Sequence, residues 1–326
     1  MRQLAAIILC PLLFAACATH RPVADEPVVP LPYVRVVDDG TNLVQLQMAV
    51  RKFVPARSRG PAIWLVSASH IGDPAYYREL QARLSRPTLV LFEGIRPDAD
   101  SPPRFVDTNS ASSDLGTLQQ TAARSLGLVF QLDAINYHCP NFRNSDLSVA
   151  ELQQLLAQPA AGGTAAQGEF NSLVSAMQGD TLMGYLINTI LRFIGSDTKL
   201  RAEARLVLIE MLGQLRGDLS QLQNLPPALQ RLLQTLIDSR NQKVLSDLKP
   251  ALRRVPSHGS IALFYGTAHM DNLEQRLCAE LHYRSVADEW LTVCSVDLEQ
   301  SGISPVEAQS IRWFARKQME KFQPQP

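Results

Sequence analysis

Two short apolar runs on either side of one amphipathic helix constrain the fold of this chain most strongly. The runs are residues 62–67 and residues 88–92, and their length and composition indicate buried strands. Between them, Asp73-Pro74 predicts the start of a helix that ends near Leu84, because aspartate can cap a helix and proline suits its first position. The unit therefore predicts two parallel strands joined by a right-handed helical crossover.

A second α/β segment lies near the C-terminal end. Residues 261–265 predict an apolar strand, residues 272–281 a helix, and residues 289–296 a further strand. The stretch between the two segments, at about residues 146–255, has mostly helical patterns. The expected fold class is α/β, with a mixed or mostly parallel sheet that comes from two strand–turn–helix halves and carries a long helical insertion.

Three further helical segments are predicted. Residues 118–126 form a helix that Gly127 is placed to end, since glycine adopts the left-handed conformation found after helix C-termini. Apolar residues between Met183 and Ile194 recur at helical spacing and indicate a core or inter-helix face. Residues 305–322 predict an amphipathic helix near the C-terminus.

The N-terminus has the features of an export signal. An arginine precedes the apolar residues 4–14, and small residues follow up to Ala18. The apolar part is shorter than the ~20 residues that span a bilayer. Residues 13–17 resemble a bacterial lipobox, with Cys17 as the lipid-bearing first residue of the mature chain. The alternative is ordinary cleavage after Ala18, because residues 16–18 have the form A-x-A.

These patterns give an expected domain plan. Residues 1–17 are a lipoprotein-type signal peptide, and residues 18–40 are a Pro-rich tether. Residues 41–300 form the α/β domain, and residues 301–326 form a C-terminal helix and tail. A lipid on Cys17 would anchor the protein in the bacterial cell envelope, on the periplasmic face of the outer membrane. A soluble periplasmic protein is the alternative.

Charge and motif content exclude several classes of protein. The 31 Lys and Arg residues balance 31 Asp and Glu residues, whereas nucleic-acid-binding domains usually carry a basic surplus. We therefore expect no nucleic-acid partner. The sequence has no H-E-x-x-H, G-x-S-x-G, Walker or dinucleotide-binding glycine pattern, which removes several common enzyme classes.

The cysteines predict no disulfide framework. Three belong to the folded domain, namely Cys139, Cys278 and Cys294. A Cys278–Cys294 bridge would form in an oxidising compartment, and three buried thiols are the reading that we favour. A cysteine zinc site is not expected, because there is no C-x-x-C pair.

Two histidines and a glutamate follow predicted strands. His70 and His269 each come just after an apolar run and before a helix, and Glu93 directly follows the run 88–92. The carboxyl ends of parallel strands meet at one edge of a sheet, where ligand sites gather. Two imidazoles and a carboxylate at that edge would bind a divalent metal, or would act without metal as a general base and its orienting partner. The alternative for each histidine is a hydrogen-bonded structural role.

Secondary candidates lie near the first α/β unit. They are Asp73, Gln131, Asp133, His138 and Asp146. Asp146 is more simply explained as part of a helix start, because residues 148–151 have the capping-box form. His138 lies beside Cys139, but adjacent residues rarely point at one site.

Four short motifs in order resemble the TraB/GumN/TIKI superfamily. They are residues 69–74, residues 92–94, the pair Arg240-Asn241, and residues 265–270. That superfamily is marked by two G-x-x-H motifs, an acidic residue that ends the second strand, and an Arg-Asn pair on a helix before the second histidine. The order and spacing match from about residue 60 to residue 296.

One position departs from the superfamily pattern. Ser67 stands where the first motif usually has glycine. Glycine would permit a positive φ or a close backbone approach, so the departure bears on whether this copy of the site is active.

The resemblance implies an α/β fold with a helical insertion and a metal-dependent, peptidase-like hydrolase of the cell envelope, because the TIKI branch has protease activity. His70, Glu93 and His269 would be catalytic groups or ligands of Mn, Co or Zn. Arg240 would orient a carboxylate or polarise a carbonyl, and Asn241 would form hydrogen bonds in the cleft. A solvated helix face is the alternative for both.

The substrate would be a peptide or a small molecule. The alternative function is a non-catalytic envelope lipoprotein that binds a small ligand or haem in the same cleft. A scaffold that uses the helical insertion as its contact face is a third possibility.

Overall fold

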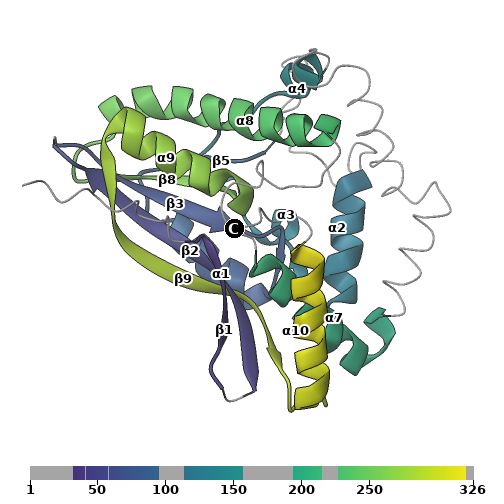
Figure 1. Cartoon of the computed structure of the whole chain (residues 1–326). Coiled ribbons are helices and arrows are strands. Elements are labelled where there is room, and N and C mark those ends of the chain that lie inside the picture. Colours follow the sequence, from purple (N-terminus) through teal and green to yellow (C-terminus); the bar gives the residue numbers. More distant parts are fainter. Residues whose placement is uncertain are drawn as a thin grey trace, which may run out of the picture. The chain divides into compact units, whose positions relative to one another are not determined.

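The computed structural model describes residues 32–40, 42–57, 59–94, 114–156, 194–214 and 227–320. They form a seven-stranded mixed sheet with helices on both faces (Figure 1), so the predicted α/β class is confirmed. The predicted signal peptide, Cys17 and the apolar stripe from Met183 to Phe193 lie outside these residues. None of the helices within the described ranges is long and apolar enough to span a membrane.

One half of the sheet is parallel. Its strands lie in the order β3 (Ala62–Ala68), β8 (Ser260–Gly266), β5 (Leu89–Phe92) and β7 (Phe142–Asn144). The predicted strand–helix–strand unit is present, with α1 (Pro74–Leu84) between β3 and β5. The C-terminal segment places β8 between those two strands. The carboxyl ends of β3, β8 and β5 therefore lie next to one another.

The other half of the sheet is antiparallel. The long strand β2 (Leu43–Pro55) pairs along its whole length with β9 (Tyr283–Asp297). Its other edge pairs with β1 (Val34–Asp38) and then with β3. The expected tether at residues 18–40 is thus wrong at its C-terminal end, because Tyr33 and Val34 are buried and β1 belongs to the sheet.

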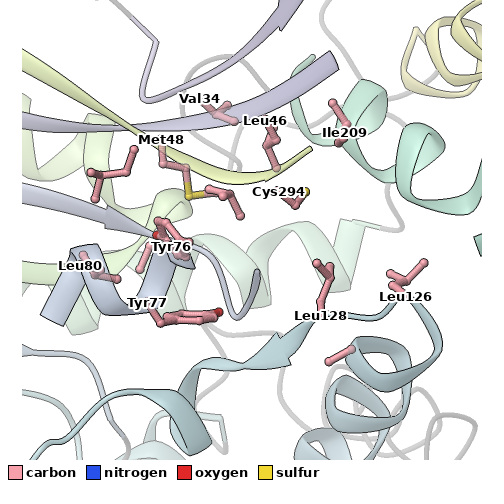
Figure 2. Close-up of a cluster of buried hydrophobic side chains, with 14 of the residues drawn as sticks. Val34, Leu46, Met48, Tyr76, Tyr77, Leu80, Leu126, Leu128, Ile209 and Cys294 are labelled. Carbon is pink, nitrogen blue, oxygen red and sulfur yellow. The ribbon is translucent and has the colours of Figure 1, made fainter. Parts of the chain in front are cut away.

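Both faces of the parallel strands are covered, and this explains why their sequences are unbroken apolar runs. Along β8, Leu263 and Tyr265 face α8 (Pro227–Arg254) and α9 (Met270–Leu281). Ala262 and Phe264 belong to the cluster on the opposite face, which Figure 2 shows with tyrosines of α1 and residues of β1 and β2. The sheet and its two helical layers fix the position of every strand end.

Shorter elements complete the described part. Helix α2 (Asp114–Ser125) ends as predicted at Gly127, which has a φ of 66°. After it, β6 (Val129–Phe130) pairs with β4 (Ile71–Gly72) and leads into α3 (Gln131–Ala134). Further helices are α4 (Val149–Leu156), α7 (Thr198–Leu212) and α10 (Pro305–Met319), and η3 (Thr267–His269) is a 3-10 turn.

Two helix starts test the predicted caps. The capping box of α4 is present, since the Ser148 backbone N–H donates to Glu151 Oε2 at 2.6 Å and the Glu151 N–H donates to Ser148 Oγ at 3.1 Å. Asp73 precedes α1 as expected, but its side chain makes no capping hydrogen bond. It accepts instead from Arg205 Nη2 at 2.6 Å, because α7 packs nearby and offers a charged partner.

The three cysteines in the described part of the chain, Cys139, Cys278 and Cys294, are free thiols. Cys278 and Cys294 are not joined, and Cys278 is exposed on α9 whereas Cys294 is buried on β9. Cys139 is partly buried. The favoured prediction of three buried thiols is therefore wrong for two of them.

Candidate active site

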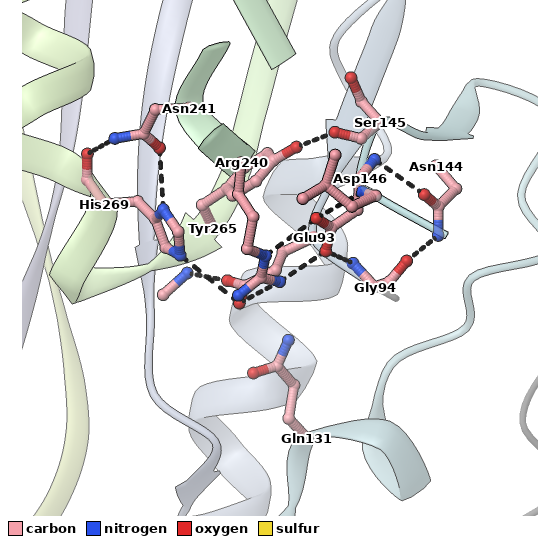
Figure 3. A network of polar contacts seen from close by, with 12 residues as sticks. Glu93, Gly94, Gln131, Asn144, Ser145, Asp146, Arg240, Asn241, Tyr265 and His269 are labelled. Carbon is pink, nitrogen blue, oxygen red and sulfur yellow. Dashed lines mark hydrogen bonds and ion pairs between the residues drawn. The ribbon is translucent and has the colours of Figure 1, made fainter. Parts of the chain in front are cut away.

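A polar cluster lies where β5 and β8 end (Figure 3). Glu93 follows β5, and its backbone N–H donates to the carbonyl of Phe264 at 3.0 Å. Its side chain reaches across to β8, where Gly266 N–H donates to Glu93 Oε2 at 2.6 Å. A Cβ on Gly266 would lie 3.2 Å from the same oxygen, so glycine permits this close approach.

Arg240 joins two carboxylates in this cluster. Its Nη2 lies 2.8 Å from Glu93 Oε1. Its Nε and Nη2 donate to the two carboxylate oxygens of Asp146 at 2.9 Å and 2.5 Å, a bidentate arrangement. The Asp146 side chain is fully buried, and the backbone N–H groups of Gly94 and Leu147 also donate to it. The single positive charge of Arg240 thus faces the two negative charges of Glu93 and Asp146.

The charges around Glu93 keep it ionised. Burial alone raises the pKa of a carboxyl group. Burial is also the largest single influence on Glu93, but the attraction of Arg240 and the smaller contributions from His269, the Gly266 N–H and His70 together outweigh it and lower the pKa of Glu93 to about 2. Glu93 is therefore a carboxylate at neutral pH.

His269 is held as a neutral imidazole. Its Nδ1 lies 2.8 Å from Asn241 Oδ1, and its ring packs edge-on against the ring of Tyr265 with centroids 5.5 Å apart. Burial lowers its pKa, although the charge of Glu93 opposes that shift. Because an amide oxygen only accepts, Nδ1 carries the proton and Nε2 has a free lone pair. Nε2 lies 3.7 Å from Glu93 Oε1.

His70 lies at the end of β3 as predicted, but its side chain is exposed. Its backbone carbonyl accepts from the Gln131 N–H at 2.8 Å. His70 is the smallest of the influences that lower the pKa of Glu93, so it lies near the cluster. The histidine therefore borders the site and leaves the buried part to Glu93, Arg240 and His269.

The donor set offers a metal two ligands where the sequence predicted three. His269 Nε2 and Glu93 Oε1 lie 3.7 Å apart, close to the roughly 3–3.5 Å that separates two ligand atoms on one zinc ion. Arg240 already occupies the same carboxylate oxygen. Across the described ranges, no three or more His, Cys, Asp or Glu side chains are grouped to hold a metal. The arrangement thus does not fit the three-ligand site.

Ser67, the departure from the glycine motif, is accommodated without strain. It is buried in β3, and its hydroxyl lies 2.8 Å from the hydroxyl of Thr267. The bond links the end of β3 to the turn that carries His269. The Ser67 hydroxyl therefore helps to hold the turn of the second motif, residues 265–270, in place.

The secondary candidates separate into two groups. Asp146 belongs to the cluster through Arg240, and it also lies just before the capping box of α4. Gln131 is 7% exposed and donates from Nε2 to Tyr137 at 2.8 Å, and its Oε1 has no partner among the residues placed in the structure. Figure 3 shows its amide pointing toward Glu93 and Arg240. Asp133 and His138 are exposed and lie outside the cluster.

Three residues of the cluster, Tyr265, Asn144 and Ser145, were not foreseen. Tyr265 donates its hydroxyl to the Ser145 carbonyl at 2.5 Å, and Asn144 Nδ2 donates to the Gly94 carbonyl at 2.5 Å. Asn144 ends β7, a strand of three residues that shows no alternation long enough to detect. The one available signal was the polar sequence Asn-Ser-Asp at residues 144–146.

The chain was also compared with known proteins. Comparisons with protein families, with curated proteins and with solved structures found no match. The resemblance to the TraB/GumN/TIKI superfamily stays a prediction that rests on the four motifs.

Proposed function

We propose that this protein is a hydrolase in which His269 activates a water molecule beside Glu93. The observation that carries the proposal is the 3.7 Å approach of His269 Nε2 to Glu93 Oε1. Both atoms are hydrogen-bond acceptors in the charge states given above. A molecule with two donors, such as water, satisfies both at once.

The reaction follows from these two atoms. His269 Nε2 takes a proton from the water, and the oxygen adds to an acyl carbon of a peptide or small-molecule substrate. The resulting oxyanion collapses, and the leaving group departs with the proton from His269. Arg240 keeps Glu93 ionised, and its positive charge stabilises the negative charge that develops nearby.

Hydrolysis of labelled casein and of p-nitrophenyl acetate tests the proposal. We expect His269→Gln to lower the rate by about 10²–10⁴-fold, the usual contribution of a general base. His258→Gln is the matched control, because His258 is exposed in the turn between α8 and β8. Equal rates for wild type and His269→Gln would refute the proposal.

The same proteins test the alternative of a binding module. A visible absorption band after haem addition, present in the wild type and lost in His269→Gln, together with no turnover, would favour haem binding. Turnover that depends on His269 would reject it.

Metal dependence is tested separately. Metal analysis of the purified protein for Mn, Co and Zn compares wild type with the double variant His70→Ala/His269→Ala. A metal-dependent hydrolase requires a higher metal content in the wild type. Equal content in the two proteins would defeat the metal hypothesis and leave the water-activation proposal intact.

Anchoring in the cell envelope rests on Cys17. We propose that this cysteine carries the lipid, and cells grown with labelled palmitate test it. Label in the wild type and none in Cys17→Ser would support the anchor. An unlabelled wild type in the periplasmic fraction would favour the soluble alternative.

A further inference from the structure

A chain of amide groups connects His269 to the surface of the protein. Asn241 Nδ2 donates to Asn272 Oδ1 at 2.9 Å and lies 3.4 Å from the His269 carbonyl, while Asn241 Oδ1 faces the imidazole. Asn241 is fully buried on α8, and Asn272 lies on α9. Two acceptors therefore orient the first amide, and the shorter of the two hydrogen bonds is the one to Asn272.

The second amide has charged groups at both ends. Asn272 Nδ2 donates to Asp238 Oδ1 at 3.0 Å, and Arg276 Nε donates to Asn272 Oδ1 at 2.8 Å. A carboxylate only accepts hydrogen bonds and a guanidinium only donates them. These two groups leave Asn272 one orientation, with its oxygen toward Asn241.

The orientation passes along the chain to the imidazole. Since Asn272 and the His269 carbonyl both present an oxygen, Asn241 presents its NH₂ group to them and its own oxygen to His269 Nδ1. Nδ1 then holds the ring proton, and Nε2 faces Glu93 as the free base. Asn241 and His269 are both buried, so a reversed amide would leave unsatisfied polar groups.

We infer that Asp238 and Arg276, acting through Asn272 and Asn241, are positioning residues that set the tautomer of His269. Asp238 and Arg276 lie at the outer end of the chain, with 45% and 24% of their side chains exposed. They act without contact to the reacting atoms. The role of His269 Nε2 as a general base rests on the proposed function, whereas the inference about the tautomer does not.

Two-bond ¹⁵N–¹H spectra of the imidazole rings measure the tautomer directly, with the His269 signals assigned by their loss in His269→Gln. The wild type should show a protonated Nδ1 and an unprotonated Nε2. Asn272→Leu removes the nearer of the two oxygens that accept from Asn241. We expect the population of the other tautomer to rise about fivefold to tenfold, the factor that one lost hydrogen bond gives.

The matched control is the double variant Asp238→Asn/Asn272→Asp. It exchanges the carboxylate and the amide, so an oxygen still faces Asn241 and the net charge is unchanged. This variant should keep the wild-type tautomer. An unchanged tautomer in Asn272→Leu, or the same loss in the exchanged pair, would overturn the inference.

Circular dichroism checks that each variant is folded. If Asn272→Leu does not fold, the surface pair Asp238→Asn/Arg276→Gln tests the same point, because both groups that orient Asn272 then become neutral. A tautomer identical to wild type in that variant would also reject the inference. A confirmed tautomer without any hydrolysis would leave the inference standing and refute only the proposed function.

Discussion

At the scale of the residue, Glu93 contributes to stability only while it is ionised. Its pKa falls from an ordinary 4.5 to about 2 in the folded protein. Above pH 4.5 both folded and unfolded chains carry the charge, and the contribution is complete. As the pH falls from 4.5 to 2, the unfolded chain takes up the proton first, and the contribution is lost.

We therefore expect Glu93→Gln to cost on the order of 3 kcal/mol at pH 7 and much less near pH 2.5. Urea denaturation at a series of pH values measures this difference. Glu280→Gln, at a 40% exposed side chain on α9, is the control and should show no such trend. A difference between wild type and Glu93→Gln that stays constant down to pH 3 would contradict the explanation.

Arg240 also contributes to the stability of the folded protein. It compensates the buried Asp146 and the nearly buried Glu93, so Arg240→Met removes the guanidinium that pairs with both carboxylates. We expect a loss of about 3–5 kcal/mol, the usual cost of breaking a buried ion pair. Lys249→Met breaks the exposed pair with Glu280 and should cost below about 1 kcal/mol. Similar denaturation midpoints for both variants would be inconsistent with this account.

At the scale of the element, the sequence predicted what local patterns encode. The strands β3, β5 and β8 and the helix α1 were found because their apolar runs and their Asp-Pro start are local signals. The position of β8 between β3 and β5 depends on packing between distant segments, which no local pattern contains. Asp146 was undervalued for the same reason, since its partner Arg240 is 94 residues away.

The end of α2 gives a prediction at this scale. Gly127 has a φ of 66°, and a Cβ there would lie 3.3 Å from Arg201 Cδ. We expect Gly127→Ala to lower the unfolding free energy by about 1–2 kcal/mol. Gly127→Asn should cost less, because asparagine tolerates the left-handed region better. Equal losses, measured by thermal unfolding, would place the cost in the contact with Arg201 rather than in the backbone.

At the scale of the whole molecule, the site needs both halves of the chain. Glu93 and Asp146 come from the first α/β unit and the segment after it, and Arg240 and His269 come from the insertion and the C-terminal segment. The motif order predicted most of this set, and the sheet order brings it together. The polar contacts at the strand ends join residues that are far apart in the sequence, and they therefore depend on a correctly assembled sheet.

The boundary of the domain gives the last prediction. Tyr33 and Val34 are 2% and 1% exposed, β1 pairs with β2, and the Tyr33 hydroxyl donates to Glu274 at 2.6 Å. A chain that begins at Thr41, the boundary expected from the sequence, lacks the two buried side chains, the β1–β2 pairing and the hydrogen bond to Glu274. Compared with a chain that begins at Pro32, it should lose about 3–6 kcal/mol, because each buried side chain of this size contributes about 1.5–3 kcal/mol. Urea denaturation of the two chains measures the loss, and equal midpoints would show that β1 adds nothing to the stability of the sheet.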